Sequence, residues 1–89
     1  MINWVEVMQD LQADGFWVSE FLITPITVEI VVNHGNAFVE VFISTKENKI
    51  VGSELSGVVT ENGGAVCAEY SKEGIKTYRQ VLKILREHL

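Results

Sequence analysis

The sequence predicts an α+β domain, in which an antiparallel meander sheet of three to five strands is flanked by an N-terminal and a C-terminal helix in two layers. Three observations carry this prediction. Both ends of the chain place apolar residues at helical spacing, the middle is rich in Val, Ile, Phe and Trp, and turn residues interrupt that middle at short intervals. The 89 residues contain one proline and no repeat or linker, so residues 1–89 are expected to form a single domain.

The first helix is expected over residues 4–14. Asn3 and Glu6 have the spacing of a capping box, in which each side chain accepts a hydrogen bond from the other residue's backbone amide. Gly15 is suited to the left-handed conformation that ends many helices. The apolar residues at helical spacing are Trp4, Val5, Met8 and Leu11.

The strands are expected at residues 16–23, 27–33 and 36–44. A further hairpin over 50–60 and 65–70, closed by residues 61–64, is a weaker prediction because Gly52 and Gly57 are unfavourable within a strand. The last helix should begin after Ser71 as N-cap and pack on the same face of the sheet as the first helix. Its predicted apolar stripe is Ile75, Tyr78, Leu82, Leu85 and Leu89.

The charges are distributed unevenly along the chain. The first 45 residues contain no Lys or Arg, whereas all seven basic residues lie beyond them and the total formal charge is −5. Nucleic-acid binding depends on clustered cations, so the expected partner is a basic protein surface and not nucleic acid. The alternative is that the acidity serves only solubility. The acidic residues of this half are Glu6, Asp10, Asp14, Glu20, Glu29 and Glu40.

The strand pairing decides where the strand glutamates lie. A two-residue loop at His34-Gly35 pairs positions whose numbers sum to 69 and therefore sets Glu29 opposite Glu40. This pairing leaves an uninterrupted apolar inner face, whereas sums of 68 or 70 would place a glutamate in the core. A turn at Pro25-Ile26 would add Glu20 diagonal to Glu29, which predicts three glutamates on the outer face.

The predicted outer face also carries apolar side chains. Three accounts of them remain open: the 50–70 segment covers the face, the face is a homodimer contact, or it receives another protein. The apolar residues that share the parity of the glutamates are Val18, Leu22, Val31, Phe38 and Phe42.

The first helix should display a second acidic group. Glu6, Asp10 and Asp14 are four residues apart in turn, which places them on one side of the helix without an intrahelical basic partner. One alternative is that this row is a solvated helix face, near which Lys and Arg of the last helix can cross and pair with it. The other is that the row and the strand glutamates form one anionic patch that docks on a basic groove.

No pattern for catalysis, a cofactor or a metal is present, and no catalytic, cofactor-binding or metal-binding residue is predicted. The glutamates have no evident cleft for acid–base chemistry and no loop has calcium-ligand spacing. The single Cys67 is expected as an inert core thiol in a reducing cytoplasm, and Trp4 and Trp17 as core anchors. No signal peptide or membrane-spanning segment is evident, so no membrane association is expected.

The sequence therefore predicts a non-enzymatic protein-binding domain that inhibits a partner by masking its basic, nucleic-acid-binding surface. In size and charge alone it is comparable to phage anti-CRISPR and anti-restriction proteins, which imitate the charge of DNA. A homo-oligomeric structural or adaptor domain that uses the outer sheet face is the alternative, and a small ligand-binding protein is the third. The predicted partner-binding residues are Glu6, Asp10, Asp14, Glu20, Glu29, Glu40, Phe38 and Phe42.

Overall fold

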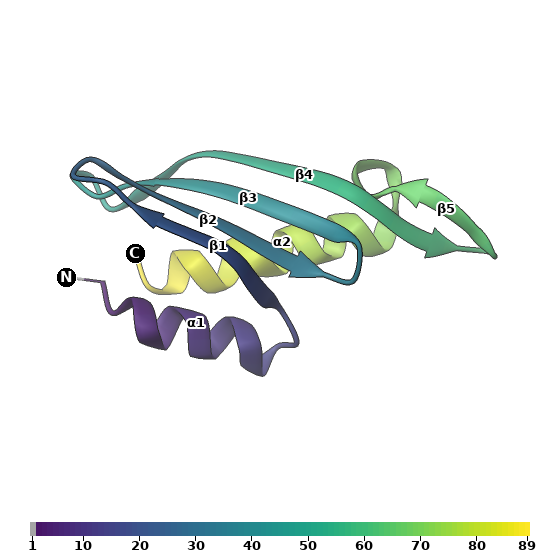
Figure 1. The fold of residues 1–89 in the computed structure, drawn as a ribbon, viewed down its shortest axis with the longest axis horizontal. Helices are drawn as coiled ribbons and strands as arrows, with labels where there is room; N and C mark the ends of the chain where they lie inside the picture. The colour runs from purple at the N-terminus through teal and green to yellow at the C-terminus, as the bar shows by residue number, and fades with distance from the viewer. Residues whose placement is uncertain (1) are drawn as a thin grey trace.

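The computed structural model describes residues 2–89 and shows the predicted combination of two helices and one antiparallel sheet (Figure 1). The sheet is a five-stranded meander with the order β1-β2-β3-β4-β5. The elements are α1 (Trp4–Ala13), β1 (Trp17–Ile23), β2 (Thr27–His34), β3 (Ala37–Ser44), β4 (Lys49–Glu61), β5 (Gly64–Cys67), the short 3-10 helix η1 (Ala68–Tyr70) and α2 (Lys72–Glu87).

Both helices lie on one face of the sheet, as predicted, and the β4–β5 hairpin extends beyond one end of this layer (Figure 1). The overall extents are 44 × 23 × 19 Å. Within residues 2–89, neither helix has the length and apolar character needed to cross a membrane.

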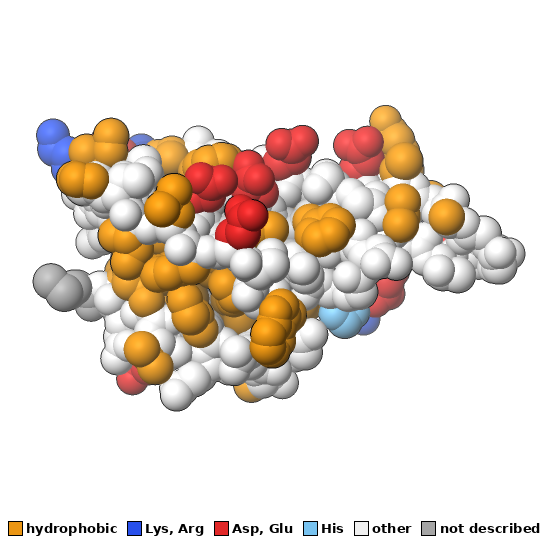
Figure 2. All heavy atoms as spheres, in the orientation of Figure 1, with side chains coloured by type: hydrophobic (Ala, Val, Ile, Leu, Met, Phe, Trp, Pro, Cys, Tyr) orange, Lys and Arg blue, Asp and Glu red, His pale blue; other side chains and the backbone are white. Residues whose placement is uncertain are grey.

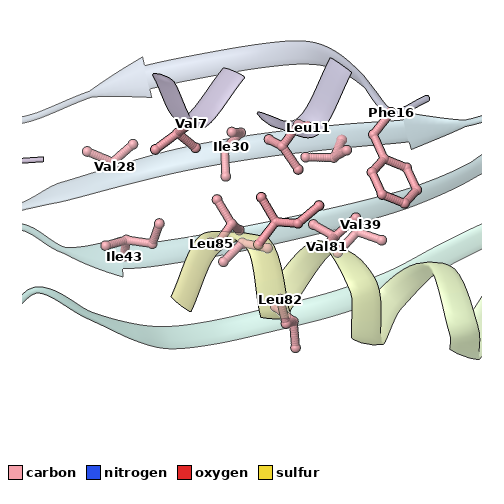
Figure 3. Packing of buried hydrophobic residues seen from close by; sticks show 13 residues of the cluster. Val7, Leu11, Phe16, Val28, Ile30, Val39, Ile43, Val81, Leu82 and Leu85 are labelled. Atoms are coloured by element: carbon pink, nitrogen blue, oxygen red, sulfur yellow. The ribbon is translucent and has the colours of Figure 1, made fainter. Parts of the chain in front are cut away.

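The core lies between the helices and the inner face of the sheet (Figure 3). The aliphatic residues on the inner face of β2 and β3 are at most 1% exposed. Every second side chain of each strand points toward the helices and is covered by them. Helix α1 contributes Val7 and Leu11, and α2 contributes Val81 and Leu85. The inner-face residues of the two central strands are Val28, Ile30, Val32, Val39, Val41 and Ile43.

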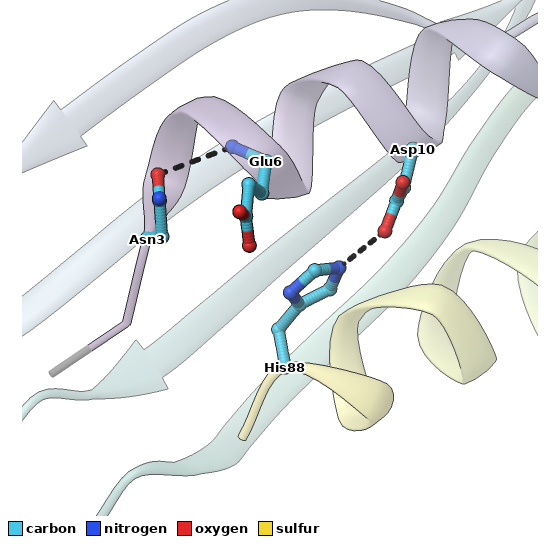
Figure 4. A network of polar contacts seen from close by, with 4 residues as sticks. All are labelled: Asn3, Glu6, Asp10 and His88. Atoms are coloured by element: carbon cyan, nitrogen blue, oxygen red, sulfur yellow. Dashed lines mark hydrogen bonds and ion pairs between the residues drawn. The ribbon is translucent and has the colours of Figure 1, made fainter.

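The predicted helix ends are largely confirmed. The Asn3 side chain accepts a hydrogen bond from the Glu6 amide at 3.3 Å, which is one half of the predicted capping box (Figure 4). Helix α1 ends before Gly15, whose φ of 85° is the left-handed conformation expected of it. Ser71 caps α2 by accepting from the Gly74 amide at 3.0 Å.

The predicted stripe of the last helix is largely confirmed, since Leu82 and Leu85 are buried and Tyr78 and Leu89 pack against the core, but the buried side of α2 is broader than predicted. Gly74, Thr77 and Val81 are buried, whereas Ile75 is only half-buried. The reason is the close packing of α2 against η1: a Cβ added to Gly74 would lie 2.2 Å from the Ala68 carbonyl oxygen. A glycine that looks unremarkable in the sequence therefore permits the close approach of α2 to η1.

The predicted register of β2 and β3 is wrong by two residues. The two-residue loop is Gly35-Asn36, not His34-Gly35, and the paired positions sum to 71. Gly35 has φ of 61°, which suits the first central position of a type II′ turn. A shift of two residues keeps every side chain on its predicted face, so the apolar pattern could not reveal the error.

Strand β1 follows the predicted pairing at its end but not at its start. Residues 20–23 pair with β2 with sums of 51, as expected from the turn at Pro25-Ile26. A β-bulge between Val18 and Glu20 then shifts the register by one residue. Val18 therefore packs against the core and Trp17 is 65% exposed, so both predictions for these residues are wrong. Trp4 does pack against the core and lies 5.4 Å from the ring of Phe21.

The 50–70 segment extends the sheet and does not cover it. Strand β4 pairs edge to edge with β3, and β5 pairs with the far end of β4. The predicted closing turn is present, with positive φ at Asn62 and Gly63. Cys67 is exposed at the end of β5, which corrects the prediction of a core thiol. Self-coverage of the outer face by this segment is therefore ruled out.

Candidate functional site

The outer face of the sheet gathers four glutamates from four adjacent strands. Val31 lies between Glu20 of β1 and Glu40 of β3, and Glu40 in turn lies directly opposite Glu54 of β4. Glu29 is one step along β2, opposite Leu22 and Phe42, and is therefore diagonal to two of the others. We call Glu20, Glu29, Glu40 and Glu54 the four-glutamate cluster.

The geometry within this cluster differs from the predicted one. Glu29 and Glu40 are diagonal neighbours instead of directly opposed residues, and the directly opposed pair is Glu40 and Glu54. The predicted diagonal relation of Glu20 and Glu29 is confirmed. Directly opposed Cβ atoms are about 5 Å apart, and two like charges there cost on the order of 0.2–1 kcal/mol. The cluster is therefore an electrostatic cost to the fold.

No cation relieves the cluster within residues 2–89. The nearest basic residue on the paired strands, Lys49, lies opposite Ser44 and forms an ion pair with Glu47 at 3.1 Å. Figure 2 shows carboxylates gathered over the sheet, with orange apolar surface beside them and no blue side chain among them. The outer face thus presents an uncompensated negative charge to solvent.

Apolar side chains flank the four-glutamate cluster on both sides. One neighbouring row contains Trp17 and Phe38, which are 65% and 38% exposed. On the other side, Glu29 itself lies between Leu22, which is 56% exposed, and the half-buried Phe42. The Phe42 ring packs beside Gly52, since a Cβ placed there would lie 3.6 Å from it. Exposed aromatic residues around charges are typical of protein-binding surfaces.

Glu54 was not among the predicted site residues. The loop between β3 and β4 would pair Glu40 with Ser53 if the register at Ser44 and Lys49 continued unchanged. A bulge after Phe42 shifts the pairing by one residue and brings Glu54 opposite Glu40 instead. No sequence signal marks that bulge, so only the tertiary structure reveals the fourth glutamate.

The acidic row of α1 lies on the other side of the sheet from the four-glutamate cluster. Asp10 contacts the His88 imidazole at 2.6 Å (Figure 4). Asp14 accepts a hydrogen bond from the Gln80 side chain at 2.7 Å. Both partners come from α2 or its C-cap, but neither is a Lys or Arg, so the predicted pairing of this row with the basic residues of the last helix is not found among residues 2–89. Glu6 is exposed on the same helix.

The predicted single anionic patch is therefore absent. The inner-face residues of β2 contact α1, and Glu29 alternates to the opposite side of that strand. The structure brings Glu20, Glu29, Glu40, Phe38 and Phe42 together on one surface, and separates them from Glu6, Asp10 and Asp14 by the thickness of the sheet.

A hollow of about 220 Å³ lies between α1, the β2–β3 hairpin and α2. Its lining includes Phe16 and His34, whose rings meet edge to face at 5.5 Å. In the part of the chain that the structure describes, no group of three His, Cys, Asp or Glu residues is arranged to hold a metal ion.

Comparison of the chain with protein-family models, with curated proteins and with solved structures finds no match. Its function must therefore be argued from the surface itself.

Proposed function

We propose that this chain is a non-enzymatic protein-binding domain whose outer sheet face docks on a basic surface of a partner protein and masks it. The observation that carries the proposal is the four-glutamate cluster, which has no Lys or Arg paired with it among residues 2–89 and is flanked by exposed aromatic residues. Electrostatic complementarity of this kind speeds association and selects partners, while aromatic side chains supply most of the binding energy.

The presence of four like charges side by side, in spite of their cost to stability, supports the proposal. Glu40 and Glu54 repel each other in the folded protein, and a neutral residue at either position would remove that cost. Stability is commonly sacrificed at binding sites in this way. Because the acidic row of α1 lies on the other side of the sheet, the proposed binding surface is the outer sheet face alone. This surface is smaller than the predicted anionic patch, and binding by it does not require that the chain imitate the charge of a nucleic acid.

The proposal is tested by charge reversal on the sheet face. The variant Glu40→Lys/Glu54→Lys changes the charge of this surface, and Glu6→Lys/Glu47→Lys makes the same net change on exposed positions elsewhere. A partner captured from the native host by the wild-type chain is purified and its affinity is measured for all three proteins by calorimetry.

The sheet-face variant should bind about tenfold more weakly or worse, and the control variant nearly as well as the wild type. Wild-type affinity should also fall steeply between about 50 mM and about 500 mM salt, because exposed charges are screened. Equal binding by the two variants, or an affinity that is insensitive to salt, would contradict the proposal.

A further inference from the structure

Helix α2 concentrates the cations of the chain. Five of the seven Lys and Arg residues lie on it, and all five are exposed. They are spaced alternately by four and three residues, which places them along one side of a helix with 3.6 residues per turn. We call this group, Lys72, Lys76, Arg79, Lys83 and Arg86, the basic stripe.

The basic stripe points away from the sheet. Gly74, Val81 and Leu85 are buried against the core, and the helical periodicity places the cations on the opposite side of α2. The outer face of the sheet points in the other direction, because both helices occupy the inner face (Figure 1). The molecule is therefore bipolar, with a cationic helix side and an anionic sheet side.

The cations of the basic stripe form no ion pairs in the described part of the chain, and they border an open depression. Among residues 2–89, none of its five cations forms an ion pair with a carboxylate. The long side chains of the stripe border an open depression of about 520 Å³, and the half-buried Ile75 provides an apolar part of its lining. The residues that line this depression are Lys72, Ile75, Lys76, Arg79, Gln80 and Lys83.

The two charged surfaces have comparable dimensions. The central cations, from Lys76 to Lys83, span about 10 Å along the helix at 1.5 Å per residue. The row from Glu20 to Glu54 crosses three strand spacings and spans about 14 Å. One surface can therefore lie along the other with several opposite charges facing each other at once.

We propose that the basic stripe of one copy docks on the outer sheet face of a second copy, so that the chain associates head to tail. This inference rests on the proposed function and names the basic partner as the chain's own α2. The contact is heterologous, so repetition gives an open chain or closes into a ring. Face-to-face association through two sheets would instead bring two four-glutamate clusters together, which is unfavourable.

Nucleic acid is the other anion that a basic stripe could bind. The net charge of −5 and the three glutamates on or beside α2, namely Glu69, Glu73 and Glu87, oppose a polyanion at long range. A protein surface with four carboxylates in a compact group is repelled less than a long polyanion is, because it faces fewer of the chain's own negative charges. The observations therefore favour a second copy.

The first test measures the mass of the full chain by light scattering and sedimentation over a range of concentrations. At about 20 mM salt the average mass should rise with concentration to about twice the monomer mass or more, and at about 500 mM salt it should return to the monomer. A monomer under both conditions, or an oligomer unaffected by salt, overturns the inference.

The second test reverses each surface separately. Glu40→Lys/Glu54→Lys makes the sheet face repel the stripe, and Lys76→Glu/Arg79→Glu makes the stripe repel the sheet face. Each variant alone should remain monomeric at low salt, whereas an equimolar mixture should associate again, because each surface then meets its opposite. Circular dichroism confirms that both variants fold. Failure of the mixture to associate contradicts the inference.

Two control variants distinguish the effect of charge at the two proposed contact surfaces from the effect of the chain's net charge. Lys46→Glu/Lys49→Glu carries the same total charge as the stripe variant, and Glu6→Lys/Glu47→Lys the same as the sheet-face variant. Both controls should associate as the wild type does. Loss of association in either one would show that net charge and not the stripe governs assembly, and would overturn the inference.

Two further outcomes separate this inference from the proposed function. If the wild type stays monomeric but a foreign partner binds the stripe variant and not the sheet-face variant, the proposed function stands and self-association is wrong. If labelled duplex DNA or single-stranded RNA shifts with the wild type and not with the stripe variant, the stripe is a nucleic-acid surface and the inference is overturned.

Discussion

The two faces of the β2–β3 hairpin are formed by the same two strands, but they differ in how strongly their character depends on the strand register. On the inner face, all side chains from Val28 to Val32 and from Ala37 to Ile43 are aliphatic and at most 1% exposed, so one aliphatic neighbour can replace another without a change of character. On the outer face, glutamates and phenylalanines alternate with Val31 and Asn33 in adjacent rows, so the identity of each neighbour matters. The inner face therefore depends on the alternation of residues alone, whereas the chemistry of the outer face depends on the register.

The largest difference between the faces should be found in their contribution to stability. Ile30→Ala removes a fully buried side chain and leaves a cavity, which should lower the free energy of unfolding by about 2–5 kcal/mol. Val31→Ala, one residue along on the outer face, should cost about 1 kcal/mol or less because that side chain is only half-buried. Urea denaturation measures both, and comparable losses would refute the assignment of the two faces.

A smaller loss of stability is expected at Gly57, where the backbone of β4 passes close to the turn between β2 and β3. Its φ is 88°, and an added Cβ would lie 2.1 Å from the Asn36 carbonyl oxygen. Gly57→Ala should therefore destabilise the protein by about 1–3 kcal/mol or more. Gly63→Ala is the matched control, since φ is 79° but nothing lies within 4 Å. Equal thermal stabilities of the two variants would show that the close approach is absent.

The smallest effect has the opposite sign and concerns the outer face alone. Glu40→Gln removes one of two directly opposed charges, so it should raise the free energy of unfolding by about 0.2–1 kcal/mol at low salt. The gain should shrink at about 500 mM salt because the repulsion is screened. Urea denaturation of the variant and the wild type at both salt concentrations measures the difference. A destabilised variant would mean that the cluster is not an electrostatic cost.

Much of the fold could be read from local signals. Asn3, Gly15 and Ser71 mark helix ends through their own side-chain and backbone properties, and these positions agree with the structure. The turn at Asn62-Gly63 and the apolar alternation of β2 and β3 are equally local. Each of these features involves residues close in the chain, so the sequence expresses them directly.

The candidate site depends on features that the sequence does not express. The change of the hairpin loop from His34-Gly35 to Gly35-Asn36 preserves the parity of both strands, and it makes Glu29 diagonal to Glu40. Bulges in β1 and β4 then move Trp17 and Glu54 to their outer-face positions. The close approach of Gly74 in α2 to Ala68 is likewise a contact that no helical pattern predicts.

The sequence by itself determined the α+β class, the inner face and the excess of negative charge in the first 45 residues, because composition and alternation are properties of the chain alone. Only the tertiary structure decided how those charges are divided. It places three of the six acidic residues on the outer sheet face, adds Glu54 to them, and puts the other three on the far side with α1. The physical reason is that register and helix placement are set by packing between distant segments.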